Sequence, residues 1–276
     1  MRLGMLLPRV NPGGARLSGD YFLISADRME QAGFDSLWLT DALGRGYPSP
    51  DPLVALAAVA SRTRRVTLGT SILQVPIRHP FELAHRIHTT DLLSGGRLVL
   101  GVGAGSTPAD FAVLGVPFEE RFARLDSSLR VMQALWRGEV VDGVALDLFD
   151  LPRPAPDILI GSWGGSRWIP RAATEFDGWI GSAAKTSWPK LEGGIRRFRS
   201  EGGSYAVVTN VVVDPELPES PDTDEGPLVA CGLETARRRI ERFHALGFDE
   251  VVLRTPDHAD GKIAALSEAV LEAGGW

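Results

Sequence analysis

The sequence predicts a single (β/α)8 barrel, a fold of the α/β class. Eight strand-like segments alternate with helix-like segments, and the length of 276 residues suits one such barrel. In addition, the short apolar segment 97–102 ends in glycines at positions 101, 103 and 105. Buried parallel strands have such sequences, and ligands bind beyond their carboxyl ends. A doubly wound open sheet is the alternative fold, and we expect one domain over residues 1–276.

The first half of the chain contains four strand-like segments, each short and mostly apolar. The segments after them carry apolar residues at helical spacing. Pro52 lies in the first turn of one predicted helix, and Gly33 and Gly95 follow the ends of two others, as is typical of helix boundaries. The expected strands are 2–7, 34–40, 66–73 and 98–102, and the expected helices are 21–32, 52–62, 81–93 and 119–137.

The second half repeats this alternation. Two segments interrupt the pattern: residues 140–156 contain prolines, and residues 214–227 are acidic and rich in proline, which favours a surface loop. The expected strands are 158–160, 178–180, 205–213 and 250–254, and the expected helices are 166–175, 188–201, 234–246 and 259–273.

Composition excludes several classes of partner. The net charge is −6, and residues of both signs are scattered along the chain. The sequence has no basic patch with interleaved aromatic residues, so we expect no nucleic-acid partner. No apolar run approaches the roughly 20 residues of a membrane span. The single cysteine, Cys231, cannot form a disulfide within the chain, so we expect a buried, inert thiol in a reducing cytoplasm. His85 and His88 share a helix face without a third ligand, so no metal site is expected.

Polar residues follow three of the predicted strands. Asp41, after the second, either accepts a hydrogen bond from a ligand or caps the next loop. Ser71 and Gln74, at the end of the third, either bind a ligand or satisfy local backbone groups. Residues 161–166, after the fifth, form either an anion site at a helix amino terminus or a loop with a serine cap.

The glycine-rich segment itself does not predict a dinucleotide site of the Rossmann type. Ser106 occupies the position of the third glycine in that fingerprint. The segment also follows the fourth predicted strand rather than the first of a βαβ unit. A nicotinamide cofactor bound by this motif is therefore not expected.

These strand ends resemble the luciferase-like monooxygenase superfamily, whose members are barrel enzymes that bind FMN or the deazaflavin coenzyme F-420 (F420). The resemblance covers nearly the whole chain. It rests on residues 33–41 (GFDSLWLTD), 68–71 with 78–80, 93–105, 114–118 with 121–122, and 177–179.

The resemblance implies an oxidoreductase or monooxygenase that transfers hydride between the cofactor and a small organic substrate. Asp41 would face the cofactor ring, and Ser71 and Ile72 would form a bulge behind it, often through a non-prolyl cis peptide bond. The remaining residues implied to bind the cofactor are Gln74, Gly103, Ala104 and Thr107 along it and Gly161, Ser162, Gly164 and Gly165 at its phosphate.

Two positions depart from relatives in this superfamily. Deazaflavin-dependent sugar-phosphate dehydrogenases have a histidine directly after the aspartate of the second strand and a glutamate in the loop after the fourth. This chain has Ala42 and Ala104 there, so their acid/base chemistry does not transfer. Luciferase has a phosphate-binding arginine at the second position. His79 is then the candidate for proton transfer.

The cofactor and the type of activity have alternatives. The Gly-Val-Gly-Ala-Gly pattern resembles that of deazaflavin-dependent oxidoreductases, and this resemblance favours coenzyme F-420 over FMN, with the substrate expected near Trp163 and Tyr47. A barrel that binds the cofactor without catalysis is one alternative, because the acid/base pair is missing. A flavin-free lyase or isomerase is another. Many barrels in this superfamily dimerise, so a homodimer is a further expectation.

Overall fold

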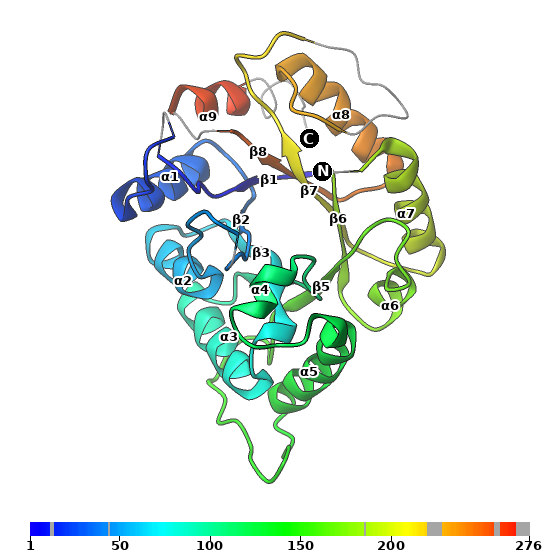
Figure 1. Cartoon of the computed structure of the whole chain (residues 1–276). Helices are drawn as coiled ribbons and strands as arrows, with labels where there is room; N and C mark the ends of the chain where they lie inside the picture. The colour runs from blue at the N-terminus through cyan, green and yellow to red at the C-terminus, as the bar shows by residue number, and fades with distance from the viewer. Residues whose placement is uncertain (12–13, 44, 185, 220–227, 257–259, 269–276) are drawn as a thin grey trace. The chain divides into compact units, whose positions relative to one another are not determined.

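The computed structural model describes residues 1–11, 14–43, 45–184, 186–219, 228–256 and 260–268. Among these residues, eight strands follow one another in sequence order around a closed barrel (Figure 1). The first strand pairs in parallel with the last, so the predicted (β/α)8 barrel is confirmed and the open sheet is wrong. The strands are β1 Arg2–Leu6, β2 Ser36–Leu39, β3 Thr67–Gln74, β4 Leu98–Gly103, β5 Asp157–Gly161, β6 Gly178–Ser182, β7 Ala206–Val212 and β8 Glu250–Arg254.

The helices match the predicted order, with differences at two places. A short helix, α4, occupies a segment where the sequence predicted none, and α6 starts three residues later than expected. The α-helices are α1 Gly19–Gln31, α2 Pro52–Arg62, α3 Pro80–Ser94, α4 Pro108–Ala112, α5 Arg121–Trp136, α6 Ile169–Thr174, α7 Trp188–Ser200, α8 Leu233–Leu246 and α9 Asp260–Leu266, and the 3-10 turns are η2 Val75–Ile77 and η3 Phe118–Glu120. Of the two segments expected at residues 214–227 and 259–273, parts lie outside the described residues.

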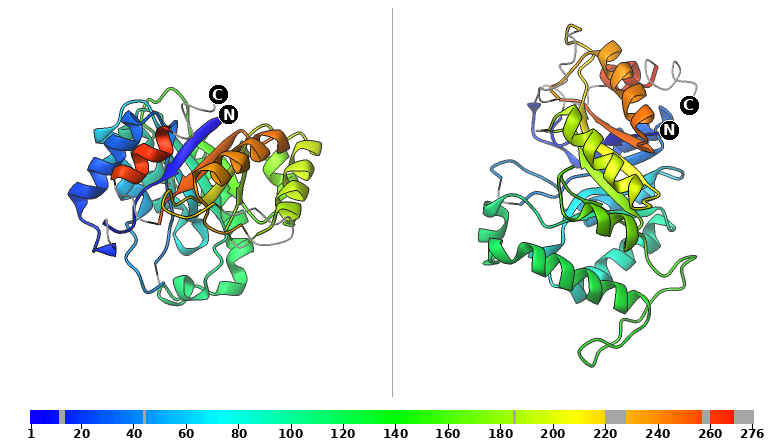
Figure 2. Two further views of the ribbon diagram at one scale, coloured as in Figure 1. Left: turned by 90° about the horizontal axis from the view of Figure 1, so that it is seen from above. Right: turned by 90° about the vertical axis from the view of Figure 1, so that its right-hand side faces the viewer.

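The chain groups into two compact units. Unit one comprises residues 1–38, 62–67 and 159–276, and unit two comprises residues 39–61 and 68–158. In unit one, α7 and α8 lie side by side (Figure 2). Buried aromatic rings of these helices and of Phe248, after α8, pack against each other. The ring centroids of Trp188 and Phe243 are 4.7 Å apart, and those of Phe243 and Phe248 are 5.7 Å apart. Cys231 is buried in the same unit, as predicted.

Unit one also contains a buried carboxylate, Glu250, at the start of β8. The side chains of Ser36 and Tyr205 donate hydrogen bonds to it, and the Trp38 indole N–H donates a third at 2.7 Å. The hydrogen bond to Glu250 and burial both raise the pKa of the Tyr205 hydroxyl, with burial the larger cause. Because a buried carboxylate is costly without partners, this cluster is a structural element of β2, β8 and the residue before β7 rather than an open site.

In unit two, α3 and α5 lie side by side (Figure 1). The Trp136 indole N–H on α5 donates to the Ala84 carbonyl on α3 at 3.2 Å. His88 also lies on α3. Its Nε2 accepts a 2.8 Å hydrogen bond from the Phe149 backbone N–H, and the rings of His88 and Phe149 stack with centroids 5.3 Å apart. His88 therefore anchors the segment after α5.

No group of three or more histidine, cysteine or acidic side chains among the described residues is arranged to hold a metal ion. None of the helices in that part of the chain combines the length and the apolar character that a membrane crossing requires.

Candidate functional site

A bulge interrupts β3 where it pairs with β4. Ser71 lies opposite Gly101 and Leu73 lies opposite Val102, so Ile72 has no partner residue on β4. The Ser71–Ile72 peptide bond is cis, as the resemblance implied. After the bulge, Gln74 lies opposite Gly103. The glycines of β4 therefore leave the backbone beside the bulge bare of side chains.

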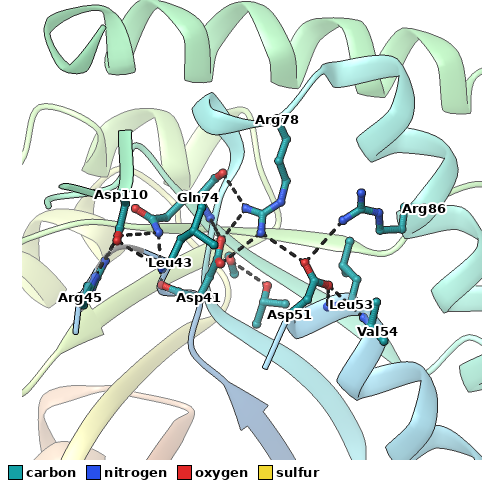
Figure 3. Close-up of polar contacts among 12 residues, drawn as sticks. Asp41, Leu43, Arg45, Asp51, Leu53, Val54, Gln74, Arg78, Arg86 and Asp110 are labelled. Carbon is teal, nitrogen blue, oxygen red and sulfur yellow. Dashed lines mark hydrogen bonds and ion pairs between the residues drawn. The ribbon is translucent and has the colours of Figure 1, made fainter. Parts of the chain in front are cut away.

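Gln74, two residues after the bulged Ile72, is held through its backbone and its side chain (Figure 3). Its backbone N–H donates to Asp41 Oδ2 at 2.9 Å, and its carbonyl accepts from Arg78 Nη1 at 3.0 Å. Its side-chain Nε2 donates to Asp110 Oδ2 at 2.9 Å and to the Asp41 carbonyl at 3.3 Å. Both hydrogens of the amide nitrogen are thus used, which leaves Oε1 as the free end of the carboxamide.

Asp41 and Arg78 form a buried ion pair. Arg78 Nη1 and Nη2 approach the two carboxylate oxygens of Asp41 at 2.5 and 3.1 Å. Burial on its own would lower the pKa of Arg78, but the hydrogen bond and negative charge of Asp41 raise it above its ordinary value. Both oxygens of Asp41 thus bind Gln74 or Arg78, 33 and 37 residues away, so these contacts do not cap the next loop, and the role of Asp41 toward a ligand stays a prediction.

The pair continues outward to two more charges. Asp51 Oδ2 lies 3.6 Å from Arg78 and 3.5 Å from Arg86 on α3. Asp51 also caps the amino terminus of α2, since its Oδ1 accepts hydrogen bonds from the backbone N–H groups of Leu53 and Val54 at 3.1 Å each. A line of alternating charges thus joins the bulge to two helices (Figure 3).

Asp110 on α4 is a second buried anion at the same place. It accepts from Arg45 Nε at 2.9 Å and Nη2 at 2.7 Å, and from the Leu43 backbone N–H at 3.2 Å. Together with its bond from Gln74, these contacts tie two separate segments of unit two, that of Leu43 and Arg45 and the end of β3, to one carboxylate on α4. Sequence reasoning missed Arg45, Arg78 and Asp110 as site residues. Arg78 stood within a matched motif without a role, and Asp110 lay in a segment where no helix was expected.

Two buried polar atoms of this cluster have no hydrogen-bond partner among the described residues: Ser71 Oγ and Gln74 Oε1. Buried polar groups in folded proteins are nearly always paired, so unpaired ones beside one bulge indicate a place for a ligand. Gly105 helps to form this place. Its φ of 77° favours glycine, and a Cβ there would lie 2.6 Å from Gln74 Oε1 and 2.9 Å from the Phe111 ring.

The other predicted residues of unit two lie on the same segments. Ala104 is buried between Gly103 and Gly105. Thr107 precedes α4, and its carbonyl accepts from the Asp110 backbone N–H at 3.1 Å. His79 is exposed just before α3, with its ring centroid 6.4 Å from that of Phe81.

The segment predicted to hold phosphate lies in unit one. The Ser162 N–H donates to the Ile180 carbonyl at 3.1 Å, and Ser162 Oγ accepts from the Trp179 indole at 3.1 Å. Gly164 is explained by packing, because a Cβ there would collide with the Lys190 carbonyl on α7. The predicted helix start at residue 166 is wrong. Ser166 N–H bonds back to the Trp163 carbonyl in a turn, so α6 begins at Ile169.

Comparison of this chain with known proteins identifies its family. The model of the luciferase-like monooxygenase family matches residues 1–213. An F420-dependent glucose-6-phosphate dehydrogenase of Amycolatopsis mediterranei is 35% identical over 175 residues, 58% of this chain and 52% of that protein. The 4-hydroxyprotoasukamycin monooxygenase of Streptomyces nodosus subsp. asukaensis is 37% identical over 46% of this chain and 34% of that protein. The chain thus spans about half or less of the length of these relatives.

Solved structures agree on the fold. The crystal structure of the monooxygenase RslO1 from Streptomyces bottropensis covers 99% of both chains with a TM-score of 0.78 and 19% sequence identity. At that identity the likeness concerns the barrel alone. The family match, which extends over most of the chain, carries the assignment. This chain belongs to the luciferase-like monooxygenase family.

Proposed function

We propose that this chain is an oxidoreductase that binds a deazaflavin or flavin ring beside the β3 bulge and acts on a small organic substrate. The observation that carries the proposal is the bulge itself. It faces the bare backbone at Gly101 and Gly103. Ser71 Oγ and Gln74 Oε1 are buried next to it and have no hydrogen-bond partner in the part of the chain that the structure describes. Family membership and the F420-dependent name of one relative support the choice of cofactor.

Within this proposal, each segment of unit two has one task. Ser71, Ile72 and Gln74 back the ring, and Gly103 with Ala104 provides a surface without bulky side chains. Ser71 Oγ can donate or accept a hydrogen bond, whereas Gln74 Oε1 can only accept. When bound, the cofactor supplies hydride transfer, and the protein supplies orientation and exclusion of water.

The phosphate assignment to Gly161, Ser162, Gly164 and Gly165 stays a prediction. So do the expected cytoplasmic location and the homodimer. Light scattering of the purified protein tests the dimer. Ala42 and Ala104 offer no acid or base, so the proposal does not include oxidation of a sugar phosphate by the chemistry of the dehydrogenases. His79 stays the candidate for proton transfer because it is an exposed imidazole directly before α3.

Fluorescence titration with coenzyme F-420 and with FMN, side by side, tests the proposal. We expect saturable binding of coenzyme F-420 and weaker binding of FMN. Tighter binding of FMN would reverse the cofactor preference while leaving the site in place. If neither binds, the proposed function is wrong and a barrel lyase or isomerase becomes the better hypothesis. With the preferred cofactor bound, turnover of an ene, imine or quinone acceptor distinguishes an enzyme from a protein that only binds the cofactor.

A further inference from the structure

We infer that Arg78 is a positioning residue, and that the Asp41–Arg78 ion pair fixes Gln74 and the bulge before it in the conformation that the cofactor needs. This inference rests on the proposed function. It assigns Asp41 and Arg78 a task distinct from direct contact with the cofactor.

The ion pair binds the backbone of Gln74 on both sides. Asp41 Oδ2 accepts the backbone N–H of Gln74 at 2.9 Å, and Arg78 Nη1 donates to the carbonyl of the same residue at 3.0 Å. One ion pair thus satisfies both backbone groups of Gln74, two residues after the bulged Ile72. A register shift leaves Ile72 without its ladder partner, so side chains provide part of the order that β-pairing provides elsewhere.

A second feature is the direction of the Gln74 carboxamide. Its Nε2 has two acceptors, Asp110 Oδ2 at 2.9 Å and the Asp41 carbonyl at 3.3 Å. A flipped amide would place an oxygen against these two acceptors, so the network determines which atom points where. Gln74 Oε1 is thereby kept as an unpaired acceptor. A ligand at this place therefore has to bring an N–H or O–H group.

A third feature is the charge of Asp41. Both oxygens of Asp41 are bonded to Arg78, and Oδ2 also accepts from Gln74. The Asp41 side chain is 4% exposed and paired with a permanent cation. Asp41 therefore acts by holding the backbone, and the groups left for the ligand are Ser71 Oγ and Gln74 Oε1.

The experiment measures the dissociation constant of coenzyme F-420 and of FMN by fluorescence, together with the melting temperature of the cofactor-free protein. Arg78→Ala should raise the dissociation constant about 10-fold to 100-fold, as loss of a supporting partner does in other preorganised sites. Arg78→Lys should give a smaller rise, because one ammonium cannot make the paired bonds of a guanidinium. Arg86→Ala is the matched control, since Arg86 shares Asp51 with Arg78 but makes no described contact with Gln74. It should leave the dissociation constant unchanged within about twofold.

A double-mutant cycle separates positioning from general destabilisation. If the ion pair acts as one unit, Asp41→Asn combined with Arg78→Ala should raise the dissociation constant no more than Arg78→Ala alone. If Arg78→Ala does not fold, Arg78→Lys and Asp41→Asn provide the comparison. If the wild-type protein binds a cofactor and these substitutions change its dissociation constant by less than twofold, or by no more than Arg86→Ala does, this inference alone is overturned. A wild-type protein that binds neither cofactor overturns the proposed function and this inference with it.

Discussion

Replacing Asp110 by alanine should destabilise the protein strongly, although the residue lies in a short helix near the surface of unit two. Its side chain is fully buried and accepts four hydrogen bonds, two from Arg45, one from Gln74 and one from the Leu43 backbone. Removing one partner of a buried ion pair costs about 3–5 kcal/mol. The Arg45 side chain is 27% exposed and can turn to water, so we expect the lower end, about 3 kcal/mol.

In a domain of this size each kcal/mol lowers the melting temperature by about 2–4 °C, so Asp110→Ala should lower it by about 6–12 °C. Asp110→Asn keeps the shape and one acceptor, and should cost about 1–2 kcal/mol. The control is Arg130→Ala, which breaks an ion pair with Asp126 from a side chain that is 73% exposed, and should change stability by less than about 0.5 kcal/mol. Urea denaturation and thermal melting followed by circular dichroism measure all three variants. If Asp110→Ala were as stable as Arg130→Ala, the buried carboxylate would not hold these segments together.

Two further predictions concern a glycine and a histidine of unit two. Gly105→Ala should cost about 2–4 kcal/mol in urea denaturation, because the new Cβ would meet Gln74 at a backbone φ of 77°. Gly115→Ala, at a φ of 64° with open space around it, should cost about 1 kcal/mol; equal losses would exclude the steric cause. Burial lowers the pKa of His88 below its ordinary 6.5, so the unfolded chain binds a proton more readily and stability should fall as the pH drops below about 6.5. Between about pH 7.5 and about pH 5.5, the melting temperature of His88→Gln should fall less than that of the wild type. An equal fall would show that other groups cause the loss of stability.

Much of the fold could be predicted because its signals are local. The α2 bounds, Pro52–Arg62, and the β8 bounds, Glu250–Arg254, agree with the expected ranges, since each is a continuous apolar or alternating segment between clear breaks. The start of α6 was wrong because Ser166 resembles a helix cap in the sequence but forms a turn with Trp163 in the structure. The five residues of α4 are too few to show helical periodicity.

The candidate site was predictable by position but not by contact. Asp41, Ser71 and Gln74 were identified because polar residues follow buried strands at the ends where ligands bind. Their partners could not be identified in the same way. Arg78 is 37 residues from Asp41, and Asp110 is 36 residues from Gln74. No local pattern shows which arginine or aspartate will be bonded, because that depends on how two loops fold against each other.

The amino-acid sequence by itself determined the barrel, the order of its strands, the family and the strand ends at which a site is expected. These follow from periodicity, glycine placement and short motifs, which act over a few residues at a time. Tertiary structure alone decided that Asp41 is bonded to Arg78, that Gln74 is held from three sides, and that Ser71 Oγ and Gln74 Oε1 are left unpaired. The physical reason is that a buried charge or amide takes its partner from whichever segment the fold brings within about 3 Å, whatever the separation along the chain.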